Sequence, residues 1–316
     1  MIKIDLITGF LGAGKTTFLR EYASYFIRQG KNIGILENDY GAVNVDMMLL
    51  QDLQGEQCEL EMVSGGCDRD CHRRRFKTKL ISMGMCGYDR VLVEPSGIFE
   101  MDEFFDVLQE EPLDRWYEIG NVIAIAEASQ GMELSSKAEY ILATEAAHAG
   151  MIVLSKVQEA SEEQIFQTKQ ALGDALKAVK CSRKIEEDQI LCKDWKEFTE
   201  ADFELIASCG YEKASYVKQD VENSEFSSLF FMNLILKQEE LEARVREILD
   251  SPKCGTVFRV KGFQRLDNDQ WIEVNGTKQG IQIRPITAGQ EILIVIGEDL
   301  RQEEIERILQ GNSKTV

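Results

Sequence analysis

The stretch Gly9-Phe10-Leu11-Gly12-Ala13-Gly14-Lys15-Thr16 decides the fold, because it is a complete G-x-x-x-x-G-K-[ST] phosphate-binding loop, or P-loop. It follows a short apolar run, residues 2–7, that is typical of a strand. It opens a stretch, residues 16–28, that is typical of a helix. Strand, loop and helix in this order are the context that the pattern requires. The sequence therefore predicts binding of a nucleoside triphosphate together with Mg²⁺.

The residue types of this loop have distinct expected roles. Glycines let backbone N–H groups point at the β-phosphate, because no Cβ stands in the way. Lys15 is expected to bridge the β- and γ-phosphates, and the Thr16 hydroxyl to bind Mg²⁺. The nucleotide-binding residues expected here are Gly9, Gly12, Ala13, Gly14, Lys15, Thr16 and Thr17.

Further short apolar runs follow the loop, and helical patterns separate them. The runs span residues 31–36, 90–94, 121–126 and 151–154. Strands that alternate with helices indicate a parallel sheet covered on both faces. We therefore expect an α/β fold: a P-loop NTPase domain, with a mostly parallel sheet covered by helices, over residues 1–213.

The pattern changes after residue 213. Helical patterns at residues 239–249 and 302–309 enclose a group of strand-like runs, at residues 256–263, 271–274, 280–283 and 292–296. Another strand-like run, residues 230–236, precedes the first helix. Strands grouped in this way suggest a smaller C-terminal α+β domain over residues 214–316.

Two strand ends carry acidic residues, and such ends face the ligand crevice of a parallel sheet. Asp39, in Asn38-Asp39-Tyr40-Gly41, is a candidate to reach the metal or its waters, and a turn without a ligand role is the alternative. Glu94, in Glu94-Pro95-Ser96-Gly97, fits a carboxylate that holds Mg²⁺ through water. Gly97 is expected to give its N–H to the γ-phosphate. Lys15, Thr16 and Glu94 are the expected catalytic residues.

The segment Ser155-Lys156-Val157-Gln158 stands where a base-recognition loop belongs. GTPases usually show Asn-Lys-x-Asp there, so we expect Ser155 and Lys156 to bind the nucleotide. Gln158 occupies the aspartate position, and its amide cannot mimic both acceptors of a carboxylate. GTP is the favoured nucleotide, and ATP stays open.

Cys67, Cys71 and His72 lie within six residues of one another. Two thiolates and an imidazole suit Zn²⁺ or a similar ion such as Co²⁺, with a fourth ligand from elsewhere. The alternative is a pair of thiols near a helix start, with His72 beginning a basic helix face. We treat these three residues as candidate transition-metal ligands.

The composition restricts the partners and the location. A formal net charge of −19 argues against sequence-independent binding of nucleic acid. Apolar runs stay well below the roughly 20 residues that span a bilayer, so no membrane association is expected. We expect a cytoplasmic protein with reduced cysteines. The sequence makes no prediction about the oligomeric state.

These motifs resemble the CobW family of P-loop GTPases, which is linked to cobalamin synthesis and metal insertion. The run from Leu6 to Thr17 is similar to the opening motif of the family. The segments 38–41 and 94–97 are similar to its Asn-Glu-Phe-Gly and Glu-x-x-Gly. Residues 258–263, with 296–297, resemble its smaller C-terminal domain.

The chain also departs from the family pattern. The family's Gly-Cys-x-Cys-Cys survives as Gly66-Cys67, with Cys71 displaced. Glu127 stands for an Asp after the fourth strand, and Glu145 begins the segment that matches Gln-x-x-x-Ala-Asp. The phosphate-binding motifs therefore match the family more closely than the metal and base motifs.

The resemblance implies a GTP-hydrolysing metallochaperone or metalloenzyme activator whose client is a metalloenzyme or a corrinoid protein. One alternative is a regulatory switch that binds a partner enzyme without carrying metal. Another is a small-molecule kinase, since kinases also use P-loops. Ile98, and no glutamine, follows Gly97, so we expect slow intrinsic hydrolysis.

Overall fold

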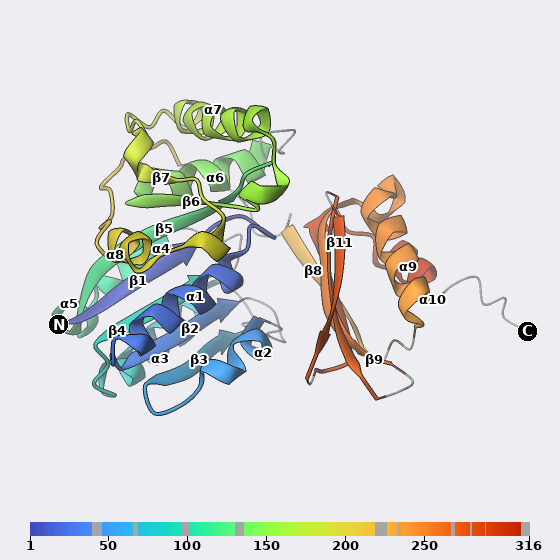
Figure 1. Cartoon of the computed structure of the whole chain (residues 1–316), viewed down its shortest axis with the longest axis horizontal. Coiled ribbons are helices and arrows are strands. Elements are labelled where there is room, and N and C mark those ends of the chain that lie inside the picture. The colour runs from blue at the N-terminus through green and yellow to red at the C-terminus, as the bar shows by residue number, and fades with distance from the viewer. Residues whose placement is uncertain are drawn as a thin grey trace, which may run out of the picture. The chain divides into compact units, whose positions relative to one another are not determined.

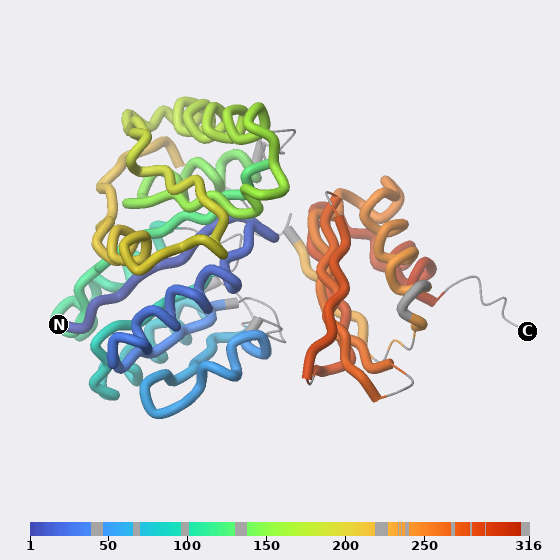
Figure 2. Tube along the Cα trace, in the orientation of Figure 1, coloured from blue at the N-terminus to red at the C-terminus, as the bar shows by residue number. Residues whose placement is uncertain are grey.

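The computed structural model of the chain forms two compact units, Met1–Gln219 and Asp220–Val316. Each unit is a continuous stretch of the chain (Figure 2), and the two are described separately. The domain boundary expected after residue 213 stays a prediction. The structure describes residues 1–39, 46–65, 69–95, 101–129, 136–218, 226–232, 234, 236–266, 269–278, 280–287 and 289–310.

The first unit is built on one parallel sheet (Figure 1). Its strands are β1 (Ile2–Thr8), β2 (Ile33–Asp39), β3 (Cys58–Ser64), β4 (Arg90–Pro95), β5 (Tyr117–Glu127), β6 (Met151–Ser155) and β7 (Ile190–Leu191). The strand order is β3-β2-β4-β1-β5-β6-β7, and each neighbouring pair is parallel. The expected α/β architecture is confirmed. β1 lies at the centre of the sheet, so the P-loop that follows it starts from the middle of the carboxyl edge.

Helices and short 3₁₀ turns connect these strands. The helices are α1 (Lys15–Arg28), α2 (Asp46–Leu50), α3 (Arg69–Gly84), α4 (Met101–Leu108), α5 (Leu113–Trp116), α6 (Ser136–His148), α7 (Glu162–Ala178) and α8 (Glu200–Ala207). The 3₁₀ turns are η1 (Gln51–Leu53), η2 (Val157–Glu159), η3 (Glu187–Gln189) and η4 (Trp195–Glu197).

A buried apolar cluster fixes α1 on the sheet. Phe18 and Leu19 of α1 pack with Ile7, Ile35 and Leu92 of three neighbouring strands. All five side chains are almost completely inaccessible to solvent. Burying one such side chain contributes roughly 1.5–3 kcal/mol, so this contact holds the start of α1 firmly at the carboxyl edge of the sheet.

The second unit is an antiparallel sheet with helices. Its elements are β8 (Phe226–Met232), α9 (Gln238–Asp250), η5 (Pro252–Cys254), β9 (Thr256–Arg265), β10 (Trp271–Thr277), β11 (Gly280–Ile286), β12 (Ile292–Glu298) and α10 (Gln302–Gln310). The strand order is β11-β10-β9-β12-β8, and neighbouring strands are antiparallel. Val245 of α9 and Ile305 of α10 pack with Val257 and Val295 of the sheet in a separate core. The smaller α+β fold expected there is confirmed.

The strand expected at residues 230–236 is displaced. β8 spans Phe226–Met232 and ends where Met232 pairs with Ile292, the first residue of β12. Leu234 and Leu236 pack against the core of the second unit instead. Their apolar character therefore reflects side-chain packing and not continuation of the strand.

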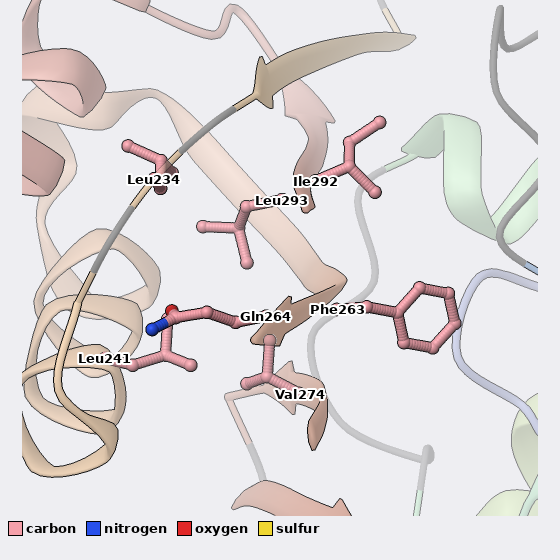
Figure 3. A pocket seen from close by; sticks show the side chains of 7 residues that line it. All are labelled: Leu234, Leu241, Phe263, Gln264, Val274, Ile292 and Leu293. Atoms are coloured by element: carbon pink, nitrogen blue, oxygen red, sulfur yellow. The ribbon is translucent and has the colours of Figure 1, made fainter. Parts of the chain in front are cut away.

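A small apolar pocket lies between α9 and the sheet of the second unit (Figure 3). Gln264 is the polar member of its lining, and its Nε2 donates to the carbonyl oxygen of Leu236. The pocket is lined by Leu234, Leu241, Phe263, Gln264, Val274, Ile292 and Leu293. The described residues of this lining carry no charge, so they offer no ligand for a phosphate or a metal ion.

None of the helices in the described ranges is long and apolar enough to cross a membrane.

Candidate nucleotide site

Two glycines allow the P-loop to fit between its neighbours. Gly9 has φ 148°, and a Cβ added there would lie 2.3 Å from the carbonyl oxygen of Ile125. Gly14 has φ 100°, and a Cβ there would lie 3.1 Å from the ring of Trp195. Side chains are unfavourable at both positions for conformation and for space. Gly12 and the buried Ala13 lie between them in the loop.

Lys15 and Thr16 begin α1 and carry the polar contacts of the loop. The Lys15 Nζ donates to the carbonyl oxygens of Gly9, at 2.8 Å, and Phe10, at 3.5 Å, and the lysine is buried. The Thr16 Oγ1 donates to Glu94 Oε1 at 2.9 Å. This hydrogen bond brings together the two predicted Mg²⁺ ligands, which are 78 positions apart in the sequence.

A second carboxylate, Glu37, lies beside Glu94. β2 and β4 pair with Glu37 opposite Glu94, and the two residues are 3% and 4% exposed. Register partners on neighbouring strands project from the same face of a sheet. That face also carries Ile35 and Leu92, which belong to the core under α1. Sequence reasoning missed Glu37, although an acid directly before Asn38-Asp39 at a strand end was a visible indication.

The oxygens of Thr16, Glu37 and Glu94 form a ligand set that suits Mg²⁺. This hard cation prefers oxygen ligands, and it binds through one or two carboxylates together with substrate phosphates. The residues present therefore fit the metal that the P-loop implies.

Ser155 is the last residue of β6, and Lys156, predicted with it to bind the nucleotide base, follows directly. The Lys156 Nζ forms an ion pair with Glu127 Oε2 at 2.7 Å, and the lysine backbone has φ 54°. Ser155 is buried and stands opposite Glu127 in the pairing of β5 with β6. Gln158 is exposed in η2. The position of the lysine is thus set by a buried carboxylate of the neighbouring strand.

Trp195, a residue that sequence reasoning did not consider, lies between this segment and the P-loop. Its Nε1 donates to the carbonyl oxygen of Leu154 at 2.9 Å, and its ring makes an edge contact with Phe18, centroid to centroid 5.7 Å. The notional Cβ of Gly14 lies near both Trp195 and Ser155. The indole therefore fills the space between the start of α1 and the end of β6.

Glu145 of α6 holds the first residues of the loop. Its Oε1 accepts hydrogen bonds from Thr8 Oγ1 at 2.9 Å and from the Gly9 N–H at 3.1 Å. The residue is completely buried. Burial raises the pKa of this carboxyl to about 7, although the charge of Lys15 and the two hydrogen bonds act in the opposite direction. The sequence showed Glu145 as a departure from the family motif, without a role.

Cys71 and His72 lie in the first turn of α3. His72 is completely buried, and its Nδ1 lies 3.2 Å from the carbonyl oxygen of Gly65. A carbonyl only accepts, so this contact places the proton on Nδ1, as in many histidines that bind metal through Nε2. Cys71 is partly exposed. Within the described ranges, no group of three or more His, Cys, Asp or Glu side chains is suited to hold a metal ion.

Several predicted site residues fall outside these observations. Cys67 and Gly97 lie outside the described residues, and so does the side chain of Asp39, the last residue of β2. Thr17 is exposed on α1. The binding roles of the predicted residues, including the Cys67, Cys71 and His72 metal set, stay predictions.

Comparison with known proteins yields matches along almost the whole chain. Residues 3–185 match the family described as CobW/HypB/UreG, nucleotide-binding domain. Residues 234–312 match the cobalamin synthesis protein cobW C-terminal domain.

Curated relatives of this chain include proteins named as zinc chaperones. Zinc chaperone YjiA of Escherichia coli strain K12 is 25% identical over 333 residues, which cover 99% of both chains. Zinc chaperone YeiR of the same strain is 27% identical over 164 residues, or 52% of this chain and 49% of the relative. Among solved structures, Zn(II)-bound YjiA GTPase from E. coli aligns over 99% of both chains, with 18% identity and a TM-score of 0.38.

Proposed function

The chain belongs to the CobW/HypB/UreG family, and on this premise we propose that it is a GTP-hydrolysing metallochaperone or metalloenzyme activator. The observation that carries the proposal is the hydrogen bond from Thr16 to Glu94, because it joins the P-loop to the strand-end acid. A P-loop that meets such an acid is the arrangement by which these proteins hold a triphosphate and its metal.

In the proposed reaction, the chain binds and orients the triphosphate. The N–H groups of the loop and the N-terminus of α1 attract its phosphates. Lys15 exchanges the carbonyl oxygens of Gly9 and Phe10 for phosphate oxygens. Thr16 and Glu94, with Glu37 beside them, would hold Mg²⁺, and the bound ion would neutralise charge on the phosphates.

Two features define the nucleotide and its turnover in this proposal. The ion pair with Glu127 orients Lys156 after the end of β6, and this supports our proposal of a purine site there. We assign GTP as the nucleotide, with a reduced preference over ATP because Gln158 replaces the usual aspartate. Ile98 follows Gly97 in place of a glutamine, so hydrolysis is slow until a client accelerates it.

Zinc is the proposed cargo, and Co²⁺ is the second choice. Cys67, Cys71 and His72 supply ligands that suit either ion. The orientation of the His72 ring toward Gly65 supports this set, because it leaves Nε2 as the ligating nitrogen. The names of the zinc chaperone relatives point to the same metal. The recipient would be a metalloenzyme or a corrinoid protein in the cytoplasm.

The test is a competitive binding experiment with GTP and ATP, run with and without Zn²⁺. We expect Mg²⁺-dependent binding with GTP preferred, and loss of binding in Lys15→Ala. Lys177→Ala, an exposed lysine paired with Asp174 on α7, is the matched control and should bind normally. Unchanged binding by Lys15→Ala would refute the site. GTP binding without any zinc binding would refute the metal cargo and favour a regulatory switch.

A further inference from the structure

Glu145 makes a contact with the P-loop that no local sequence motif provides. A single carboxylate oxygen, Oε1, accepts from both Thr8 and Gly9, and these donors are more than 130 positions away in the sequence. Within the described ranges, the second oxygen, Oε2, is buried and has no hydrogen-bond partner. A buried carboxyl with one oxygen unsatisfied is costly, so an arrangement of this kind requires an explanation.

We propose that Glu145 is a positioning residue for the nucleotide: its carboxyl fixes the first glycine of the P-loop, and it gains a proton when the triphosphate binds. The inference rests on the proposed nucleotide binding. Gly9 is the position at which the loop passes Ile125 with no room for a side chain, so its N–H direction sets the path of the residues that follow. Glu145 acts on the phosphates only through this backbone.

The charges around the carboxyl explain why the nucleotide would change its protonation. Among the described residues, Lys15 is the charged group that acts on the ionisation of Glu145, and it lowers the pKa. Other buried titratable residues on this helix and on elements that contact it are Glu103 of α4, Glu127 of β5 and His148 of α6. The pKa of Glu145 is about 7, so both forms are populated near neutral pH.

A bound triphosphate shifts the protonation equilibrium of Glu145 toward the neutral carboxyl. Its negative charges lie next to the loop, and Lys15 turns from the Gly9 carbonyl to the phosphates. Both changes disfavour the carboxylate, so the pKa of Glu145 rises on binding and the carboxyl takes a proton from solvent. A group whose pKa rises on binding makes affinity fall as pH increases, by about tenfold for each pKa unit of the rise.

Glu145→Gln isolates this effect, because the amide has nearly the same shape and does not titrate. Affinity for GTP with Mg²⁺ is measured for both proteins between pH 6 and 8.5. The nucleotide's own ionisation affects both equally, so the ratio of the wild-type Kd to the variant Kd reports Glu145. We expect this ratio to rise about tenfold across the range. Calorimetry at pH 7 in two buffers should show more proton uptake by the wild type.

Glu145→Ala tests the positioning role separately. Removal of the acceptor leaves the Gly9 N–H and the Thr8 hydroxyl unsatisfied, so this variant should bind GTP more weakly than Glu145→Gln at every pH. Circular dichroism of each variant checks that it is folded.

The outcomes separate the two proposals. A ratio that stays constant with pH, together with equal proton uptake, would overturn the protonation of Glu145 while leaving nucleotide binding intact. A folded Glu145→Ala that binds as tightly as Glu145→Gln would overturn the positioning role. Absence of GTP binding to the wild type at any pH would refute the proposed function, and this inference with it.

Discussion

At the scale of single residues, Gly9 shows how tightly the backbone of the P-loop is enclosed. An added Cβ would lie 2.3 Å from the carbonyl oxygen of Ile125 in β5. This oxygen belongs to the backbone, so no side-chain rotation can relieve the clash. Gly9→Ala should therefore lose GTP binding and lower the free energy of unfolding by about 1–3 kcal/mol or more. Gly173→Ala is the matched control, because a Cβ there meets nothing within 4 Å on α7.

The control variant should be stabilised by up to about 1 kcal/mol, as expected for Gly→Ala in a helix, and bind GTP normally. Denaturant unfolding and a GTP titration measure both effects. If Gly9→Ala bound GTP as the wild type does, the steric account of the loop would be wrong.

Glu145 also predicts a pH dependence of stability in the protein without nucleotide. Its pKa rises from 4.5 in the unfolded chain to about 7 in the folded one, because the carboxyl is buried. Such a group stabilises the fold below pH 4.5, and this contribution is lost as pH rises to about 7, a change of about 3 kcal/mol. The wild type should lose this stability as pH rises and Glu145→Gln should not. The unfolding free energy of Glu145→Gln minus that of the wild type should therefore increase from pH 5 to pH 8.

Thermal and urea unfolding of the two proteins at matched pH values measure this difference. A difference that is independent of pH would show that Glu145 does not titrate in this range.

At the scale of elements, η4 is held against the start of α1 by Trp195. The indole lies next to Gly14, and its Nε1 donates to the carbonyl oxygen of Leu154 in β6. A nucleotide bound to the P-loop should therefore change the environment of the indole. We predict that GTP changes the fluorescence of a variant in which Trp116 and Trp271 are replaced by Phe. Replacement of Trp195 by Phe in the otherwise wild-type chain should abolish the change. If GTP still changed the fluorescence of the protein without Trp195, another tryptophan would be responsible for the change.

The elements that sequence reasoning identified were those with strong local patterns, and the missed ones had weak patterns. β3 is an edge strand that alternates charged and apolar residues, and Lys79 of α3 and Tyr88 contact its Glu61 and Glu59. A search for continuous apolar runs finds buried central strands and overlooks such an edge. α7 was missed although its capping box, Ser161 with Gln164, is visible in the sequence.

The residues of the candidate site also fall into two groups, those that a local sequence pattern predicts and those that it does not. Gly9, Lys15 and Thr16 follow from one contiguous motif, and Glu94 from its place after an apolar strand. The contact of Glu145 with Gly9 could not be predicted, because it depends on how α6 packs against β1 across 136 sequence positions. Glu37 likewise becomes significant only when the register of β2 and β4 places it opposite Glu94.

At the scale of the whole molecule, the two units have separate hydrophobic cores. The cluster under α1 is drawn from residues before 210, and the cluster around α9 and α10 from residues after 228. We therefore predict that a fragment of residues 1–219 folds and binds GTP with Mg²⁺, whereas residues 220–316 bind none. Circular dichroism and nucleotide titration of both fragments test this. An unfolded 1–219 fragment would show that its core requires the second unit.

The central claim is that the chain is a GTP-dependent metallochaperone with zinc as its cargo, and we therefore expect the bound nucleotide to change its affinity for Zn²⁺. The most direct test is the Zn²⁺ affinity of the whole protein, measured by competition with a chromophoric chelator, in the presence of Mg²⁺ with either GDP or a non-hydrolysable GTP analogue. The account predicts an affinity that differs between the two states by about tenfold, or about 1.4 kcal/mol of coupling, and a loss of this difference in Lys15→Ala. Equal zinc affinity in both nucleotide states would contradict it.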